Sequence, residues 1–202
     1  MASLQQGVGM VEILVTVFVL AVGLLGVASL QFVGTFTNTD ALNRSQSVLI
    51  AQQLAERLRA GSAMSSQGNG LVVSNTYFEE DIYNFSNLSC EAEITDFACY
   101  CLTIPATIPD CTSTTCSADE FAEFDAYEMS CAIEANNPNV HISVSCDDNN
   151  DLDDESCSAG SRHTILLRWP ADNWRDQSRA LNSECNVGVT DPYDCVVLDV
   201  TL

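Results

Sequence analysis

The chain lacks lysine altogether, has only seven arginines, and contains neither a cysteine before Cys90 nor a proline before Pro105. With 28 acidic residues, its net charge is −21. An acidic surface repels nucleic-acid phosphates, so the scarcity of basic residues argues against DNA or RNA as a partner. Proline would break a helix, so its absence leaves residues 8–60 free to form one continuous helix.

The negative charge lies beyond Ala60. Up to that residue three acids are balanced by three arginines, so the remaining chain carries the entire −21. The sequence therefore divides into a neutral N-terminal part and a strongly acidic C-terminal part, for which solubility or attraction of cations is the usual reason. The six charged residues of the neutral part are Glu12, Asp40, Glu56, Arg44, Arg57 and Arg59.

A long apolar segment runs from Ile13 to Leu30 and slightly beyond. A bilayer core is about 30 Å thick, and a helix needs roughly 20 apolar residues to cross it. Glu12 stands alone at the start of this segment, and no further charge follows until Asp40. Because a carboxylate is costly in lipid, Glu12 is a candidate functional residue. A secretory signal peptide is not indicated, because a basic leader and a small-residue cleavage site after the run are both missing.

The residues around Glu12 resemble the type III signal of type IV prepilins. Gly7 is followed by Val8 as the first mature residue and by Glu12 as the fifth. The run from Leu14 to Gln31 is similar to minor pilins of the PilV type. The resemblance implies that a prepilin peptidase cuts after Gly7 on the cytoplasmic side and methylates the new amine of Val8.

The position of the cut and the charge of the leader can both be compared with the family pattern. A cut after Gly9 would make Glu12 the third residue, which the family pattern does not allow. The leader, residues 1–6, contains no lysine or arginine, whereas such leaders are usually basic. Positive residues on the cytoplasmic side normally set the orientation of a membrane helix, so this chain departs from the family in its orientation signal.

After such a cleavage, the amine of Val8 would lie within one to two helical turns of Glu12. In an array of packed helices, the Glu12 carboxylate can neutralise its own amine or that of a neighbouring subunit. A buried charge without a partner costs several kcal/mol, so this pairing would set the register of assembled subunits. The alternative is a plain single-pass anchor, in which the helix dipole and headgroup water tolerate Glu12.

The second half of the expected helix is amphipathic, with Leu49, Leu54 and Leu58 among its apolar residues. A helix of about 50 residues is about 75 Å long, which exceeds any bilayer, so this half is expected to pack on the remainder of the chain. Gly61 is the expected stop. The expected domains are a leader at 1–7, the helix at 8–60 and a disulfide-rich globular head at 61–202.

The head shows period-two alternation in several short stretches, which predicts strands of an antiparallel sheet. Ser117 and Glu120 form a capping-box signature, which predicts a helix at 118–135. Residues 124–133 (FDAYEMSCAI) and 164–169 (TILLRW) resemble PilV-type heads, with Met129 where that family usually has tryptophan. The fold class is thus α+β and type IV pilin-like, with a long helix packed on the sheet. Strands are expected at 71–77, 88–94, 99–104, 140–146, 163–169 and 196–202, and a loop at 62–70.

Ten cysteines, all in the head, indicate a disulfide framework formed in an oxidising compartment. Zinc is less favoured, because there is no CxxC pair and the two histidines lack finger spacing. On a strand, Cys99 and Cys101 would face opposite sides and should not pair with each other. The favoured pairs are Cys111–Cys116 and Cys146–Cys157. The ten are Cys90, Cys99, Cys101, Cys111, Cys116, Cys131, Cys146, Cys157, Cys185 and Cys195.

The densest acidic run, residues 147–155, places oxygen ligands at alternate positions. Calcium takes six to eight oxygen ligands, so it is the one candidate cofactor. An EF-hand is not matched, because Leu152 replaces the turn glycine and Ser158 the bidentate glutamate. The alternative is a solvated acidic loop, stapled if Cys146 and Cys157 pair. The candidate ligands are Asp147, Asn149, Asp151, Asp153 and Glu155.

The chain shows no signature of an enzyme. It has no GxSxG elbow or Cys–His motif, and His141 and His163 lie in strand-like segments where they are expected to be structural. Trp169 and Trp174 are expected to pack in the core rather than to form an exposed patch. The arginines of the head are expected to pair with its acids or to contact another acidic pilin: Arg162, Arg168, Arg175 and Arg179.

The sequence therefore predicts a minor pilin that acts by assembly, anchored in the inner membrane by one helix and later part of an extracellular type IV pilus. The resemblance implies as partners the prepilin peptidase, other minor pilins, the major pilin and a tip adhesin, and as activities pilus assembly, adhesion and twitching motility. One alternative is a minor pseudopilin of a type II secretion system, which shares the N-terminal signal. Another is a membrane-tethered, calcium-dependent adhesion module.

Overall fold

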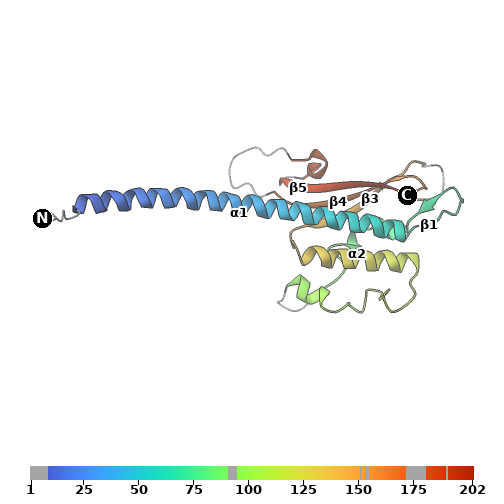
Figure 1. Ribbon diagram of the computed structural model, residues 1–202. Coiled ribbons are helices and arrows are strands. Elements are labelled where there is room, and N and C mark those ends of the chain that lie inside the picture. The colour runs from blue at the N-terminus through green and yellow to red at the C-terminus, as the bar shows by residue number, and fades with distance from the viewer. Residues whose placement is uncertain (1–8, 91–94, 151, 153–154, 172–180, 190) are drawn as a thin grey trace, which may run out of the picture. The chain divides into compact units, whose positions relative to one another are not determined.

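The computed structural model describes residues 9–90, 95–150, 152, 155–171, 181–189 and 191–202. The chain divides after Leu42 into two compact units, and each is described by itself. The first helix, α1, runs over Met10–Ala60 and contributes to both (Figure 1). The expected start at Val8 lies outside the described residues, and the end at Ala60 is as predicted.

In the first unit, α1 exposes its apolar side chains. Phe18, Leu25 and Leu30 are 68%, 71% and 75% exposed. The hydroxyls of Thr35 and Thr37 donate to the carbonyls of residues four positions earlier, at 2.9 Å each, so their polar groups are satisfied within the helix. Within the described part of the chain, α1 is the only helix long and apolar enough to cross a membrane.

The second unit is built on a three-stranded antiparallel sheet of order β3-β4-β5. Its strands are β3 (His141–Asp147), β4 (Arg162–Pro170) and β5 (Tyr193–Thr201). The three expected strands in these regions are therefore confirmed to within a few residues. A small hairpin joins β1 (Ala63–Met64) to β2 (Leu71–Val72), so the segment 62–70, expected to be a loop, contains a short strand and a turn.

The core lies between the sheet, the C-terminal half of α1 and the second helix, α2 (Ala118–Glu134). Leu54 and Leu58 of α1 and Ile165 and Leu167 of β4 are fully buried, as their spacing on helix and strand predicts. Burying one such side chain contributes roughly 1.5–3 kcal/mol, so α1 is held to the sheet by several of these contacts. Trp169 is buried in the same core, and Trp174 lies outside the described residues.

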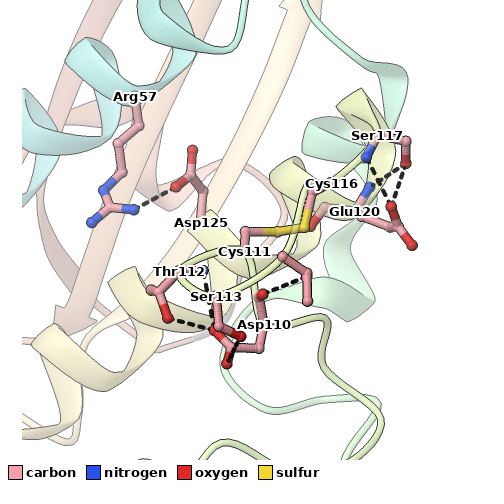
Figure 2. Close-up of a disulfide and its surroundings, with 10 residues drawn as sticks. Arg57, Asp110, Cys111, Thr112, Ser113, Cys116, Ser117, Glu120 and Asp125 are labelled. Atoms are coloured by element: carbon pink, nitrogen blue, oxygen red, sulfur yellow. Dashed lines mark hydrogen bonds and ion pairs between the residues drawn. A yellow bond between two sulfur atoms is a disulfide. The ribbon is translucent and has the colours of Figure 1, made fainter.

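The start of α2 has the capping box that its sequence predicts (Figure 2). The Ser117 hydroxyl accepts from the amide of Glu120 at 3.3 Å, and the Glu120 carboxylate accepts from the amide of Ser117 at 2.8 Å. The bonds that the Glu120 carboxylate accepts from the Ser117 backbone amide and from the Ser117 hydroxyl lower the pKa of Glu120. The helix ends at Glu134, one residue before the expected end.

Three expected strands are wrong in whole or in part. The segment 71–77 is a strand only at Leu71–Val72, after which Ser74 caps the short helix η1 (Asn75–Phe78). The segment 99–104 is not a strand, because η3 (Phe97–Cys101) is helical there. The aromatic ring of Tyr100 stacks on Phe85 instead of pairing along a sheet. Residues 88–90 are not in a strand either, and residues 91–94 lie outside the described part.

Two further short helices complete the unit, η2 (Glu80–Ile82) and η4 (Ser183–Asn186). Asn84, which follows η2, caps the outer edge of β3 at one residue, Ile142. Its side-chain amide donates to the carbonyl of Ile142 and accepts from the amide of Ile142, both at 2.9 Å. Asn84 has φ 55°, a left-handed conformation that asparagine tolerates better than most residues.

We expect Asn84→Ala to lower the free energy of unfolding by about 2–3 kcal/mol. Two hydrogen bonds to a strand are lost, at about 1 kcal/mol each, and alanine is less tolerant of a positive φ than asparagine. Asn84→Gly is the matched control, because it removes the same hydrogen bonds without the backbone strain. Chemical denaturation should rank alanine below glycine and glycine below wild type; no loss in either variant would contradict the role of this side chain.

Candidate functional site

The first candidate site is the N-terminal end of α1. Gly7 and Val8 lie outside the described residues, so the structure does not place the expected cleavage point. Glu12 lies in the first turn of α1, where its amide donates to the carbonyl of Gly9 at 2.9 Å. A carboxylate in the first turn is stabilised by the helix dipole. It is the one acidic residue of α1 before Asp40, as the sequence shows.

The second candidate site is the acidic loop between β3 and β4. Asp147 pairs with Arg162 at 2.7 Å, and the Asn149 side chain donates to the carbonyl of Ala159 at 3.2 Å. Glu155 accepts from the hydroxyl of Ser65 at 2.7 Å, on the hairpin between β1 and β2. Asp151 and Asp153 lie outside the described residues. Among the described residues of this loop, no three carboxylates come together.

Asp148, which the sequence analysis did not single out, organises this loop. One of its carboxylate oxygens accepts from the amide of Ser158 at 2.9 Å, the hydroxyl of Ser161 at 2.9 Å and the amide of Asn150 at 3.3 Å. The bond from the Ser158 backbone is the main cause that lowers the pKa of Asp148 to about 2. The loop is thus closed by hydrogen bonds to a carboxylate as well as by a disulfide.

We expect Asp148→Asn to lower the thermal unfolding midpoint at pH 7 and to lower it progressively less as the pH falls through about 2. The pKa of Asp148 is 3.8 in its ordinary state and about 2 when folded, so the ionised group stabilises the fold fully above pH 3.8 and loses this effect as the pH falls toward 2. Thermal unfolding of both proteins between pH 7 and pH 2 measures the difference. Asp147→Asn, which removes an ion pair with the exposed Arg162, is the control. An equal effect in both variants would contradict the assignment.

All ten cysteines are paired, which confirms the disulfide framework. The two expected pairs, Cys111–Cys116 and Cys146–Cys157, are both present. Cys99 and Cys101 do not pair with each other, as predicted, although they lie on a helical turn rather than on a strand. The remaining pairs are Cys90–Cys99, Cys101–Cys131 and Cys185–Cys195.

His163 is a core residue beside one of these disulfides. Its Nε2 lies 3.3 Å from Cys157 Sγ, and its Nδ1 lies 3.3 Å from the carbonyl of Val200. Burial lowers the pKa of His163. Cys146, Cys157 and His163 place ligand-type atoms within 4.8 Å of one another, but the disulfide already uses both sulfurs. His163 is therefore a structural residue of the core, as expected.

A buried charged network joins α1 to α2. Arg57 donates to Asp125, whose side chain is fully buried (Figure 2). It also pairs with Glu128 at 2.5 Å. The Tyr77 hydroxyl donates to the second oxygen of Asp125 at 2.6 Å. Burial, together with this bond to Asp125, raises the pKa of Tyr77, so the hydroxyl stays a donor. The sequence does not indicate this network, because Asp125 is one of 28 acids and has no distinctive spacing.

The arginines of the second unit mostly serve as internal partners. Arg44 of α1 bonds the buried Asp194 of β5 at 2.7 Å. Arg162 pairs with Asp147, which agrees with the expectation that the head's arginines pair with its own acids. The guanidinium of Arg168 lies 5.5 Å from the centre of the Tyr193 ring. Arg175 and Arg179 lie outside the described residues. Charged contacts thus tie α1, β4 and β5 together at several points.

Comparison with protein-family models, with curated proteins and with solved structures gives no match for this chain. The class of the protein follows from its own architecture. It combines a long N-terminal helix, apolar enough to span a membrane, with a small antiparallel sheet and five disulfides. A disulfide-rich α+β head joined to a possible membrane anchor is the description that these findings support.

Proposed function

We propose that the chain is a minor pilin of a type IV pilus, made as a prepilin and then built into or beneath the fibre. The observation that carries the proposal is the position of Glu12. It lies in the first turn of a helix whose large apolar side chains are exposed from Met10 to Phe32. A helix of this kind needs an apolar surrounding, which either lipid or a bundle of like helices can supply.

The Glu12 carboxylate favours a bundle of like helices over lipid as the final surrounding of α1. In lipid alone, Glu12 needs only headgroup water, and its position relative to Val8 has no particular use. In a bundle, a methylated amine at Val8 gives it a partner of opposite charge, and an unpaired charge in that setting would be costly. Pairing between subunits therefore favours one axial register, which is what assembly of an ordered fibre requires.

The head suits exposure outside the cell. Five disulfides form and persist in an oxidising compartment, and they restrict the unfolded chain in a small domain. The net charge of −21 keeps such a head soluble and leaves nucleic acid an unfavourable partner. These features support an anchor in the inner membrane, followed by a place in an extracellular fibre. The prepilin peptidase and other pilins are the partners that this route needs.

Leader cleavage tests the proposal. Co-expressed with a prepilin peptidase, the chain is expected to lose residues 1–7, and Gly7→Val is expected to stay at full length. Gly9→Val is the matched control, because a cut after Gly7 leaves Gly9 in the mature chain and a Cβ at Gly9 meets nothing within 4 Å. Intact-mass spectrometry distinguishes the products. Normal processing of the Gly7 variant, or a block caused by the Gly9 variant, would contradict the proposal.

A further inference from the structure

The two outer edges of the head's sheet are closed unequally. Asn84 occupies the edge of β3 at Ile142, as described above. A second asparagine, Asn186, does the same on β5: its side chain donates to the carbonyl of Tyr193 at 2.9 Å and accepts from the amide of Tyr193 at 2.8 Å. The next outward amide, that of Cys195, donates to the Asp194 carboxylate at 2.9 Å. The first part of the β5 edge is therefore blocked.

The remainder of that edge is open. In an antiparallel strand, the backbone groups of alternate residues point to the same side, and the register of β5 with β4 is unbroken from Tyr193 to Thr201. Because Tyr193 and Cys195 point away from β4, so do Val197, Asp199 and Thr201. None of the described residues forms a hydrogen bond with the outward N–H or C=O groups of these three. Such a row is a template for another strand.

A groove of about 720 Å³ adjoins this open stretch. It lies between α1 and β5, and its lining includes Leu49, Gln52 and Gln53 from α1 and Leu198, Asp199 and Val200 from β5. All of these residues belong to the second unit. Apolar side chains and amides thus stand beside a free strand edge, which is the arrangement that an added extended peptide uses.

Charge indicates which peptide fits. Both arginines at the groove already have carboxylate partners: Arg57 has Asp125 and Glu128, and Arg59 has Glu56 at 2.6 Å. Among the described residues, the one partner of the exposed Asp199 carboxylate is a neutral hydroxyl, that of Thr164, which donates at 2.8 Å. A second copy of this chain would bring another strongly acidic head against the first, which is repulsive. The open acid and the negative head favour a segment that carries lysine or arginine.

We propose that the edge of β5 from Val197 to Thr201 binds an extended, basic segment of a partner protein, which adds a fourth strand beside the groove. The partner's backbone pairs with Val197, Asp199 and Thr201, and its basic side chains face Asp199. Asn186 keeps this pairing away from the first part of β5, and the groove adjoins the stretch that remains. The inference depends on the head alone, so it holds or fails separately from the assignment to a pilus.

The probe is a labelled peptide of three Lys-Val repeats, titrated by fluorescence anisotropy into the full chain in detergent micelles. We expect saturable binding. An analogue with every backbone nitrogen methylated keeps the charge but has no N–H donors, so it should bind at least about tenfold more weakly, which corresponds to about 1.4 kcal/mol. A Glu-Val peptide should not bind. Equal binding of the methylated peptide would show attraction by charge alone and would overturn strand addition.

Two variants locate the site. Val197→Pro removes one outward N–H, and proline is tolerated on an edge strand when that group does not pair within the sheet. Asp199→Lys reverses the charge that faces the peptide. We expect each to weaken the Lys-Val peptide about tenfold or more, with an unchanged far-UV spectrum. If Val197→Pro does not fold, Asp199→Lys and the methylated peptide still decide the question. Unchanged affinity in Asp199→Lys, or concentration-dependent dimers of the chain that exclude the peptide, would overturn the proposal.

Discussion

Replacing Arg57 with methionine is expected to lower the free energy of unfolding by about 3 kcal/mol. The Asp125 side chain is fully buried and would keep only the Tyr77 hydroxyl as a donor. Removing one partner of a buried ion pair typically costs about 3–5 kcal/mol, and the lower end applies because the Arg57 side chain is itself 33% exposed. Chemical denaturation of the full chain with its disulfides intact measures the loss.

Glu128→Gln is the matched control for this variant. It removes the other carboxylate that contacts Arg57, but this carboxylate is 35% exposed, and such pairs contribute about 1 kcal/mol or less. The expected order of stability is therefore wild type, then Glu128→Gln, then Arg57→Met. An equal loss in the two variants would mean that the buried carboxylate does not depend on Arg57, and that α1 is held to α2 by apolar contacts alone.

Replacing Glu12 with alanine is expected to reduce the amount of the chain in surface fibres at least tenfold. The proposed assembly leaves the amine of Val8 without a partner in every subunit that carries the substitution. A penalty of about 1.4 kcal/mol already gives a tenfold change in an equilibrium, and an unpaired charge among apolar helices costs more than that. Quantitative immunoblotting of sheared fibres, relative to the membrane fraction, measures the effect.

A control on the same helix separates loss of charge from loss of structure. Val15→Ala truncates an apolar side chain one turn away and keeps the carboxylate, so it is expected to enter fibres at a near-normal level. Both variants should show the same disulfide-bonded head, because Glu12 lies in the first unit and all ten cysteines lie in the second. Normal incorporation of Glu12→Ala would remove the argument for register, although leader cleavage could still occur.

Local patterns in the sequence predicted much of this fold. The absence of proline and the apolar run gave α1, the Ser117–Glu120 pair gave the start of α2, and period-two alternation gave β3, β4 and β5. Two disulfides between cysteines close in sequence were also predicted. In each case the signal lies within a few residues, so it depends on the geometry of one helix, strand or loop and little on the tertiary fold.

Features that depend on distant residues were missed. Cys101 pairs with Cys131, 30 residues away, because η3 packs against α2, and no local spacing indicates this. The segment 99–104 was predicted to be a strand, but the aromatic contact of Tyr100 and the disulfide stabilise a helical turn there. The acidic loop was interpreted through alternate oxygen ligands, whereas Asp148, which falls between those positions, accepts the hydrogen bonds that close it.

The most direct test of the account is mass spectrometry of the N-terminal peptide of this chain, recovered from sheared surface fibres. Assembly through a processed helix predicts a peptide that begins at Val8 and carries one methyl group on its amine. A chain in the same fibres that still begins at Met1, or one cut elsewhere, would contradict the account, because Glu12 would then stand at the wrong distance from the amine that it is proposed to neutralise.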